Sequence, residues 1–227
     1  MAGQLVFPFG VEPALRRENF IHAPCNEQAF QFIGRWPDWP ARAAALYGPA
    51  GCGKSHLAAI WREQARAHLL PARDQTPGGL DTLVPYSVLV IEDLDRDGPS
   101  QARDRALLAL FERPSAWLLL TARTPPAEWG SVIGDLKSRF QSLIAFAMWA
   151  PDDALLSGLV AKHFADRQLD VPDAVVKRIV THVERTPEAI AAFVARADRK
   201  ALAEKRPVTE RLVLELLESE AHMDNQD

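Results

Sequence analysis

A glycine-rich octapeptide at residues 48–55 constrains the fold of this chain more than any other feature. It reads Gly-Pro-Ala-Gly-Cys-Gly-Lys-Ser, which is the residue spacing of a phosphate-binding P-loop. Its glycines let consecutive backbone N–H groups face one concavity that binds an anion, and the following helix adds the positive end of its dipole. Because this loop requires a strand before it and a helix after it, the chain is predicted to contain an α/β sheet.

The residues on either side of the loop fit this requirement. The apolar run at 43–47 predicts a buried strand, and a helix is expected over residues 54–68. A chance glycine-rich turn is the alternative, and the order strand, loop, helix argues against it. We expect Lys54 to reach the β- and γ-phosphates and Ser55 to bind Mg²⁺. The predicted nucleotide-binding residues of this segment are Gly48, Pro49, Ala50, Gly51, Cys52, Gly53, Lys54, Ser55 and His56.

The remaining pattern changes character near residue 150. Buried strands are predicted at 88–91, 117–121 and 145–148, and helices at 26–34, 102–111 and 133–140, with Asn26 as an N-cap and a loop over 74–85. Beyond 150, only helical patterns follow, at about 152–167, 172–183, 186–205 and 209–218. We therefore predict a tail at 1–18, a parallel α/β nucleotide-binding domain at 19–150 and a small all-helical lid domain at 151–227.

The strand predicted at 88–91 ends in two acids, Glu92 and Asp93. An apolar strand that ends in acids downstream of a P-loop is the Walker B arrangement. One carboxylate holds Mg²⁺, and the next orients the attacking water, so Ser55, Glu92 and Asp93 are the predicted metal site and Asp93 a predicted catalytic residue. An acidic strand end that only meets solvent is the alternative. The order Glu-Asp is reversed from the usual one, and glutamate is one methylene longer, which affects the geometry around Mg²⁺.

Composition excludes several other classes of function. A net charge of −4 and a pI near 5.9 argue against broad, sequence-independent binding to nucleic acid. Two cysteines give no disulfide framework, and six scattered histidines give no metal-ligand spacing. We find no apolar run that could cross a bilayer and no signal-peptide pattern, so a cytoplasmic protein without membrane contact is expected.

Taken together, these motifs resemble the AAA+ ATPases, and specifically the DnaA family of replication initiators. The resemblance runs from about residue 19 to about residue 217, and no helix-turn-helix DNA-binding domain follows. It implies that Asn19 and Phe20 lie near the nucleotide base, that residues 119–126 form the sensor 1 region, and that Arg139 in Leu-Lys-Ser-Arg-Phe is an arginine finger acting in trans. A surface arginine is the plainer reading of Arg139.

A DnaA-like module without the DNA-binding domain resembles the Hda family, whose members bind the DNA polymerase sliding clamp and promote ATP hydrolysis by DnaA. The discriminating segment is the tail, where Gln4, Leu5, Phe7 and Phe9 match clamp-binding chemistry: glutamine for a small pocket and apolar side chains for a groove. Pro8 restricts the extended form and so lowers the entropy lost on binding. The alternative is a tail that folds back on its own domain.

Three departures from the DnaA pattern bear on hydrolysis. Arg123 stands where the initiator has an aspartate, Glu92 replaces the leading Walker B aspartate, and Glu188 (or Ala189, after a shift of one) stands where the lid would supply the sensor 2 arginine. An acid near the γ-phosphate disfavours ATP, because like charges repel. We therefore expect bound ADP, or a preference for it over ATP, and weak or absent intrinsic ATPase activity.

Two readings of function follow. In the first, the protein is a nucleotide-bound regulator of replication initiation, an inhibitor that binds the clamp and stimulates DnaA. In the second, it is an autonomous AAA+ ATPase, such as a helicase loader or remodeller. A P-loop small-molecule kinase is a third possibility, for which no acceptor site is evident. Direct sequence-specific DNA binding is not expected. The sequence alone does not determine which of ADP and ATP is preferred, how fast ATP is hydrolysed, or whether the protein forms a homo-oligomer.

Overall fold

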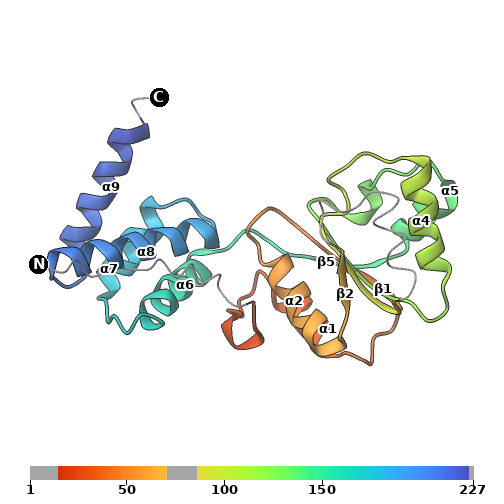
Figure 1. Ribbon diagram of the computed structural model, residues 1–227, viewed down its shortest axis with the longest axis horizontal. Helices are drawn as coiled ribbons and strands as arrows, with labels where there is room; N and C mark the ends of the chain where they lie inside the picture. Colours follow the sequence, from red (N-terminus) through yellow and green to blue (C-terminus); the bar gives the residue numbers. More distant parts are fainter. Residues whose placement is uncertain (1–14, 71–85, 225–227) are drawn as a thin grey trace, which may run out of the picture.

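The computed structural model describes residues 15–70 and 86–224, and its central feature is a parallel sheet followed by a group of helices (Figure 1). The strand order is β2-β3-β4-β1-β5, and every pairing is parallel. All carboxyl ends therefore meet at one edge, and the predicted α/β sheet is confirmed. The strands are β1 (Ala43–Tyr47), β2 (His68–Leu70), β3 (Val88–Ile91), β4 (Trp117–Ala122) and β5 (Ile144–Ala147).

Helices cover both faces of the sheet, which explains why its central strands are continuous apolar runs. α1 (Glu27–Gly34) and α2 (Lys54–Ala65) pack on one face, and α4 (Gln101–Glu112) and α5 (Gly134–Gln141) on the other. Successive residues of β1 alternate between the two cores: Ala44 and Leu46 face α1 and α2, and Ala45 faces α4 and α5. Short 3₁₀ turns lie at Arg17–Asn19 and Pro126–Glu128.

The C-terminal part is helical and has a core of its own. It contains α6 (Asp153–Ala165), α7 (Asp173–His182), α8 (Pro187–Glu204) and α9 (Glu210–Asp224). Side chains cap the starts of α6 and α8, since Asp152 accepts from the Leu155 N–H at 2.7 Å and Thr186 from the Ala189 N–H at 3.2 Å. The predicted helical lid is confirmed as a helical part, while the domain limits at 18/19 and 150/151 stay predictions.

Two local predictions are wrong, the first because strand pairing overrides helical preference and the second because a local turn uses the capping side chain. The helix predicted to 68 ends at Ala65, where Arg66 adopts a left-handed conformation (φ 52°), and residues 68–70 pair with β3 as an edge strand. Asn26 begins α1 but its side chain does not cap it; it accepts from the Ala23 N–H and donates to the Ile21 carbonyl. The loop predicted at 74–85 lies outside the described residues.

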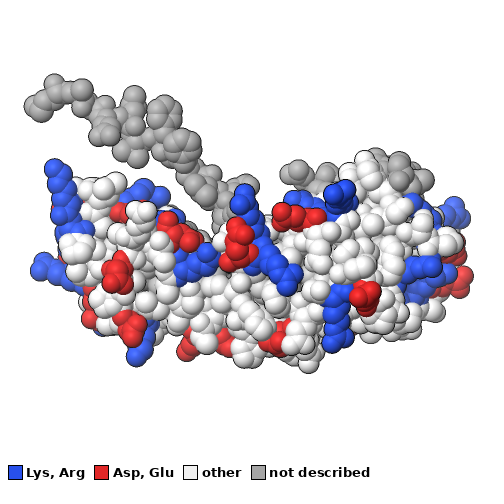
Figure 2. Space-filling model, turned by 90° about the horizontal axis from the view of Figure 1, so that it is seen from below, with Lys and Arg blue, Asp and Glu red and all other residues white. Residues whose placement is uncertain are grey.

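The segment before α1 lies between the sheet and the helical part. Ala23 and Cys25 pack with Leu155 of α6 in a small apolar cluster, and the Cys25 carbonyl accepts from the Trp149 N–H at 3.1 Å. Figure 2 shows acidic and basic side chains interspersed over one face of both parts, without a broad area of one sign. Among the described helices, none combines the length and the apolar character that a membrane span requires.

Candidate nucleotide-binding site

The P-loop is anchored by backbone hydrogen bonds to both neighbours of β1. Gly48 N–H donates to the Ala122 carbonyl at the end of β4 at 3.2 Å, and Met148 N–H, just after β5, donates to the Tyr47 carbonyl at 2.7 Å. Gly48 (φ 150°), Gly51 (φ 73°) and Gly53 (φ 94°) have positive φ angles, which glycine adopts without a steric penalty. The structure therefore forms the predicted loop between β1 and α2, at the carboxyl edge of the sheet.

Lys54 is the buried cation of this loop. Its side chain folds over the loop, and Nζ donates to the carbonyls of Gly48 and Pro49, each at 2.8 Å. Nζ also lies 3.7 Å from Cys52 Sγ. Burial raises the pKa of the Cys52 thiol, and the charge of Lys54 opposes this shift, so Cys52 serves as a small buried side chain of the loop. Lys54 stands where a phosphate-binding lysine is needed.

The predicted magnesium residues come together in part. Glu92, half-buried after β3, interacts with Ser55 at the start of α2. Burial raises the pKa of Glu92, and a hydrogen bond to Ser55 opposes that shift. Asp93 is oriented differently: its backbone is left-handed (φ 47°), and its N–H donates to Thr121 Oγ1 at 3.0 Å. A hydroxyl beside a carboxylate is the oxygen donor set that Mg²⁺ takes, with the remaining ligands from phosphate and water, so Ser55 and Glu92 fit the ion.

Aromatic rings line the start of α2, where the resemblance implies the base. Phe20 stacks on Phe30 with ring centroids 5.4 Å apart and meets His56 edge-on at 5.2 Å. His56 Nε2 lies 2.9 Å from the Arg16 carbonyl, and burial lowers the pKa of His56, so its neutral form donates this bond. Phe20 thus lies beside the P-loop, and Asn19 is its chain neighbour in the 3₁₀ turn.

The loop after β4 carries Arg123, the residue predicted for sensor 1. Arg123 is exposed, and its N–H donates to the Asp95 carboxylate at 2.9 Å. The Thr124 N–H and hydroxyl donate to the same carboxylate, each at 2.8 Å. Asp95 therefore joins the loop after β3 to the loop after β4. A buried threonine, Thr121, lies closer to the Walker B acids; the sequence placed it in the sensor 1 segment without giving it a role.

The helical part contains an arginine near the end of β5 that sequence reasoning did not identify. Arg185 lies directly before the N-cap of α8, and its guanidinium donates to Asp153 at 2.6 Å and to the Pro151 carbonyl at 3.2 Å. Pro151 follows β5, and Met148, just after β5, touches the P-loop, so Arg185 contacts the segment that joins the two parts. Ala189 is in the first turn of α8, and the side chain of Glu188 lies outside the described residues. The N-cap signal of Thr186 marked this helix start.

Arg139 lies at the opposite edge of the sheet from the P-loop. It is in the last turn of α5, which leads into the start of β5, and Ile144 there pairs with Ala44 at the start of β1. The P-loop follows the other end of β1. The Arg139 side chain is 41% exposed and pairs with Glu112 of α4 at 3.5 Å. The predicted clamp-binding residues Gln4, Leu5, Phe7 and Phe9 lie outside the described residues.

Comparison with solved structures identifies the fold. The chain is similar to domain III of the replication initiation protein DnaA of Thermotoga maritima, with a TM-score of 0.72 at 16% identity over 91% of this chain and 97% of that one. A variant of Thermotoga maritima RuvB is similar with a TM-score of 0.74 at 17% identity, over 90% of this chain and 72% of that one. AMPPCP-bound DnaA of Aquifex aeolicus is similar with a TM-score of 0.67 at 15% identity, over 81% of this chain and 64% of that one.

Sequence comparison adds nothing to this: no family model matches the chain, and no curated protein does. At such identities the likeness to solved structures shows the fold alone. The chain therefore has the AAA+ fold of DnaA and RuvB, with a P-loop between β1 and α2 and a helical part after β5.

Proposed function

We propose that this protein is a nucleotide-bound regulator of DNA replication initiation. In this account it binds the sliding clamp through its tail and stimulates ATP hydrolysis by DnaA through Arg139. The likeness to DnaA domains supports a role in replication, and the AMPPCP named for the Aquifex aeolicus protein supports an adenine nucleotide. Contact with a second AAA+ module follows from a finger that acts in trans, whether that module is DnaA or another copy of this chain.

The position of Arg139 carries this proposal. Its side chain is partly exposed and lies across the sheet from the P-loop of its own chain, so it can contact transferring phosphates only in a neighbouring molecule. An arginine supplied in trans stabilises the charge of the transition state for phosphoryl transfer. The catalysis that matters in this account occurs in a partner's P-loop.

The protein's own nucleotide has a structural role in this account. Lys54 and the P-loop N–H groups hold the phosphates, and Ser55 and Glu92 hold Mg²⁺, which neutralises phosphate charge when bound. Because the site lies beside the segment that joins the two parts, the nucleotide fixes their relative angle. We expect ADP to bind at least as tightly as ATP; titration of the purified protein with both would contradict this if ATP affinity were well above ADP affinity.

The tail supplies the second contact. Tethering to the clamp raises the effective concentration of this protein near a partner on the same DNA. We expect Gln4→Ala to abolish retention of the protein on immobilised clamp, while Arg139→Ala is retained like the wild type. Retention of Gln4→Ala at the wild-type level would contradict the clamp-binding role of the tail. It would not bear on the role of Arg139 as an arginine finger.

An autonomous AAA+ ATPase is the second candidate, and Arg185 is the observation that favours it. This arginine lies at the start of α8, where the sequence predicted an acid or alanine in place of a sensor 2 arginine. The likeness to RuvB points the same way. Basal hydrolysis by the purified protein separates the two readings: brisk turnover without DnaA favours the ATPase, and little turnover favours the regulator.

A further inference from the structure

A buried ion pair at the start of α4 lies outside the predicted nucleotide-binding residues. The side chains of Arg103 and Asp104 are 5% and 0% exposed, and Arg103 Nη1 lies 3.3 Å from Asp104 Oδ1. Buried charges are tolerated only where hydrogen bonds replace the lost water. The partners of this pair therefore show which parts of the chain it holds together.

Arg103 holds the segment that follows the Walker B acids. Its Nη2 donates to the Leu94 carbonyl at 2.7 Å, and the Leu94 N–H donates to the Thr121 carbonyl at 2.8 Å. The Asp93 N–H reaches the Thr121 hydroxyl. The cation thus fixes α4 against the carboxyl ends of β3 and β4, next to the nucleotide site.

Asp104 holds the segment that begins α5. Its Oδ2 accepts from the Ser131 hydroxyl and from the Val132 N–H, each at 2.7 Å. Ser131 Oγ in turn accepts from the Ile133 N–H at 3.0 Å, and α5 starts at the next residue. One buried carboxylate therefore fixes the N-terminus of the helix that carries Arg139.

α5 is short and firmly packed, so its start determines where its end lies. Phe140 is fully buried, with its ring centroid 5.1 Å from that of Trp129 and 6.0 Å from that of Phe111. At the far end of α4, Glu112 pairs with Arg139. α4 thus contacts the segment that leads into α5 through Asp104, near its start, and α5 itself through Glu112, its last residue.

We propose that Asp104, held in place by Arg103, is a positioning residue for Arg139, linking the segment after the Walker B acids to the finger of the same chain. This inference rests on the proposed function, because it concerns what Arg139 does to a partner's nucleotide. A misplacement of about 1 Å in a catalytic group can lower a rate by about 100-fold. Asp104 therefore governs how fast the partner's ATP is hydrolysed and leaves the strength of partner binding unchanged.

The test follows phosphate release from ATP-bound DnaA with clamp on DNA, at increasing concentrations of the full-length protein. We expect Asp104→Asn to lower the maximal stimulated rate by about tenfold or more, with half-maximal stimulation at the wild-type concentration. Ser131→Ala, which keeps the buried charge and loses one of its partners, is expected to lower the maximal rate by less. If Asp104→Asn does not fold, Ser131→Ala alone tests the inference.

Ser100→Ala is the matched control for loss of stability alone. Ser100 caps α4 by accepting from the Arg103 N–H at 3.3 Å, a bond within the start of α4 itself. We expect this variant to lower the melting temperature and to keep the maximal stimulated rate.

Each outcome is decisive. Unchanged maximal rates in both Asp104→Asn and Ser131→Ala would overturn the inference, as would an equal loss in Ser100→Ala or a shift confined to the half-maximal concentration. Arg139→Ala in the same assay separates the two claims. If it keeps full stimulation, the proposed function fails; if it loses stimulation while Asp104→Asn and Ser131→Ala keep it, only this inference fails.

Discussion

At the scale of single residues, Glu92 and Asp93 have separate environments although they are adjacent in sequence. Their position after an apolar strand predicted an acidic pair near Mg²⁺. Their separation was not predictable, because it depends on the left-handed backbone of Asp93 and its bond to Thr121. The structure places Glu92 against Ser55, so the longer side chain of the pair is the one that contacts the other predicted metal ligand.

Replacing Glu92 by glutamine tests this placement. Burial raises the pKa of Glu92 in the folded protein above its pKa in the unfolded chain. The stability that its protonated form contributes is fully present below the unfolded pKa and is lost as pH rises through the folded pKa, because the buried side chain must then ionise. Glu92→Gln is therefore expected to raise the melting temperature of the nucleotide-free protein slightly at neutral pH. It is also expected to weaken the Mg²⁺ dependence of nucleotide binding on the order of tenfold. Unchanged Mg²⁺ dependence in a titration would contradict the assignment.

Gly48 is the residue at which the loop tolerates no side chain. A Cβ there would lie 2.0 Å from the Met148 carbonyl oxygen, at a φ of 150°. Gly48→Ala is expected to destabilise the protein by about 1–3 kcal/mol through backbone strain, and to weaken nucleotide binding. Gly98→Ala is the control, since a Cβ at Gly98 meets nothing within 4 Å. Equal melting temperatures of the two variants would contradict this account.

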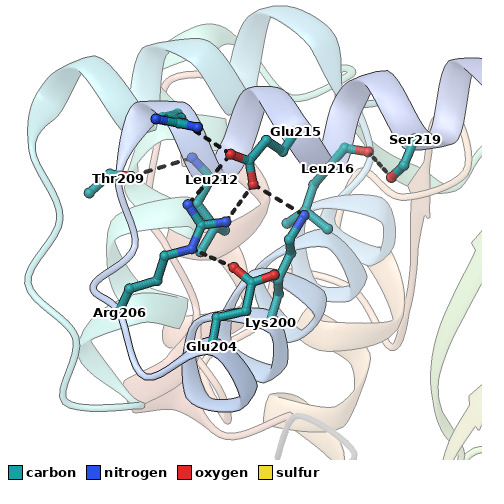
Figure 3. A network of polar contacts seen from close by, with 9 residues as sticks. Lys200, Glu204, Arg206, Thr209, Leu212, Glu215, Leu216 and Ser219 are labelled. Carbon is teal, nitrogen blue, oxygen red and sulfur yellow. Dashed lines mark hydrogen bonds and ion pairs between the residues drawn. The ribbon is translucent and has the colours of Figure 1, made fainter.

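At the scale of elements, a cluster of charges joins α8 to α9 (Figure 3). Glu215 of α9 contacts Arg206, Arg211 at 3.1 Å and Lys200 of α8 at 3.4 Å, and Arg206 also contacts Glu204. Hydrogen bonds, chiefly from Arg206, lower the pKa of Glu215 to about 2. Because its pKa is lowered, ionised Glu215 stabilises the folded state at pH values above its ordinary pKa of 4.5. This stabilisation is lost as pH falls towards about 2.

Glu215→Gln is therefore expected to lower the melting temperature at pH 7 by a small amount, because the cluster is at the surface. The difference from the wild type should shrink as pH falls from about 4.5 towards about 2. Glu210→Gln, which removes a single pair with Arg178, is the control and should have a smaller effect at pH 7. A pH-independent difference for Glu215→Gln would argue against the cluster as its cause.

Most elements were predictable, because strong local signals and the tertiary fold agree. The apolar runs at 43–47 and 88–91 became strands with those bounds, and Thr186 followed by Pro187 marked the start of α8. β2 was not predictable, since His68–Leu70 continues a helical pattern and becomes a strand only by pairing with β3. Arg185 was missed for a similar reason: only the path of the chain after β5 brings it to Pro151.

At the scale of the whole molecule, the parallel sheet separates the P-loop from Arg139. Every strand runs in the same direction, so the two lie at opposite edges of one sheet. In Figure 1, α4 and α5 lie on the side of the sheet away from α6–α9. This arrangement suits a module that holds a nucleotide at one edge and presents an arginine to a partner at the other.

The most direct test of this account is phosphate release from ATP-bound DnaA with clamp on DNA, with wild-type protein or Arg139→Ala added. Wild-type protein is expected to accelerate release, and Arg139→Ala to lose most of the effect, since an arginine finger contributes about 10³–10⁵ in rate. Lys137→Ala, an exposed cation on the same helix, should keep it. Full acceleration by Arg139→Ala, or brisk hydrolysis by the protein without DnaA, would contradict the account.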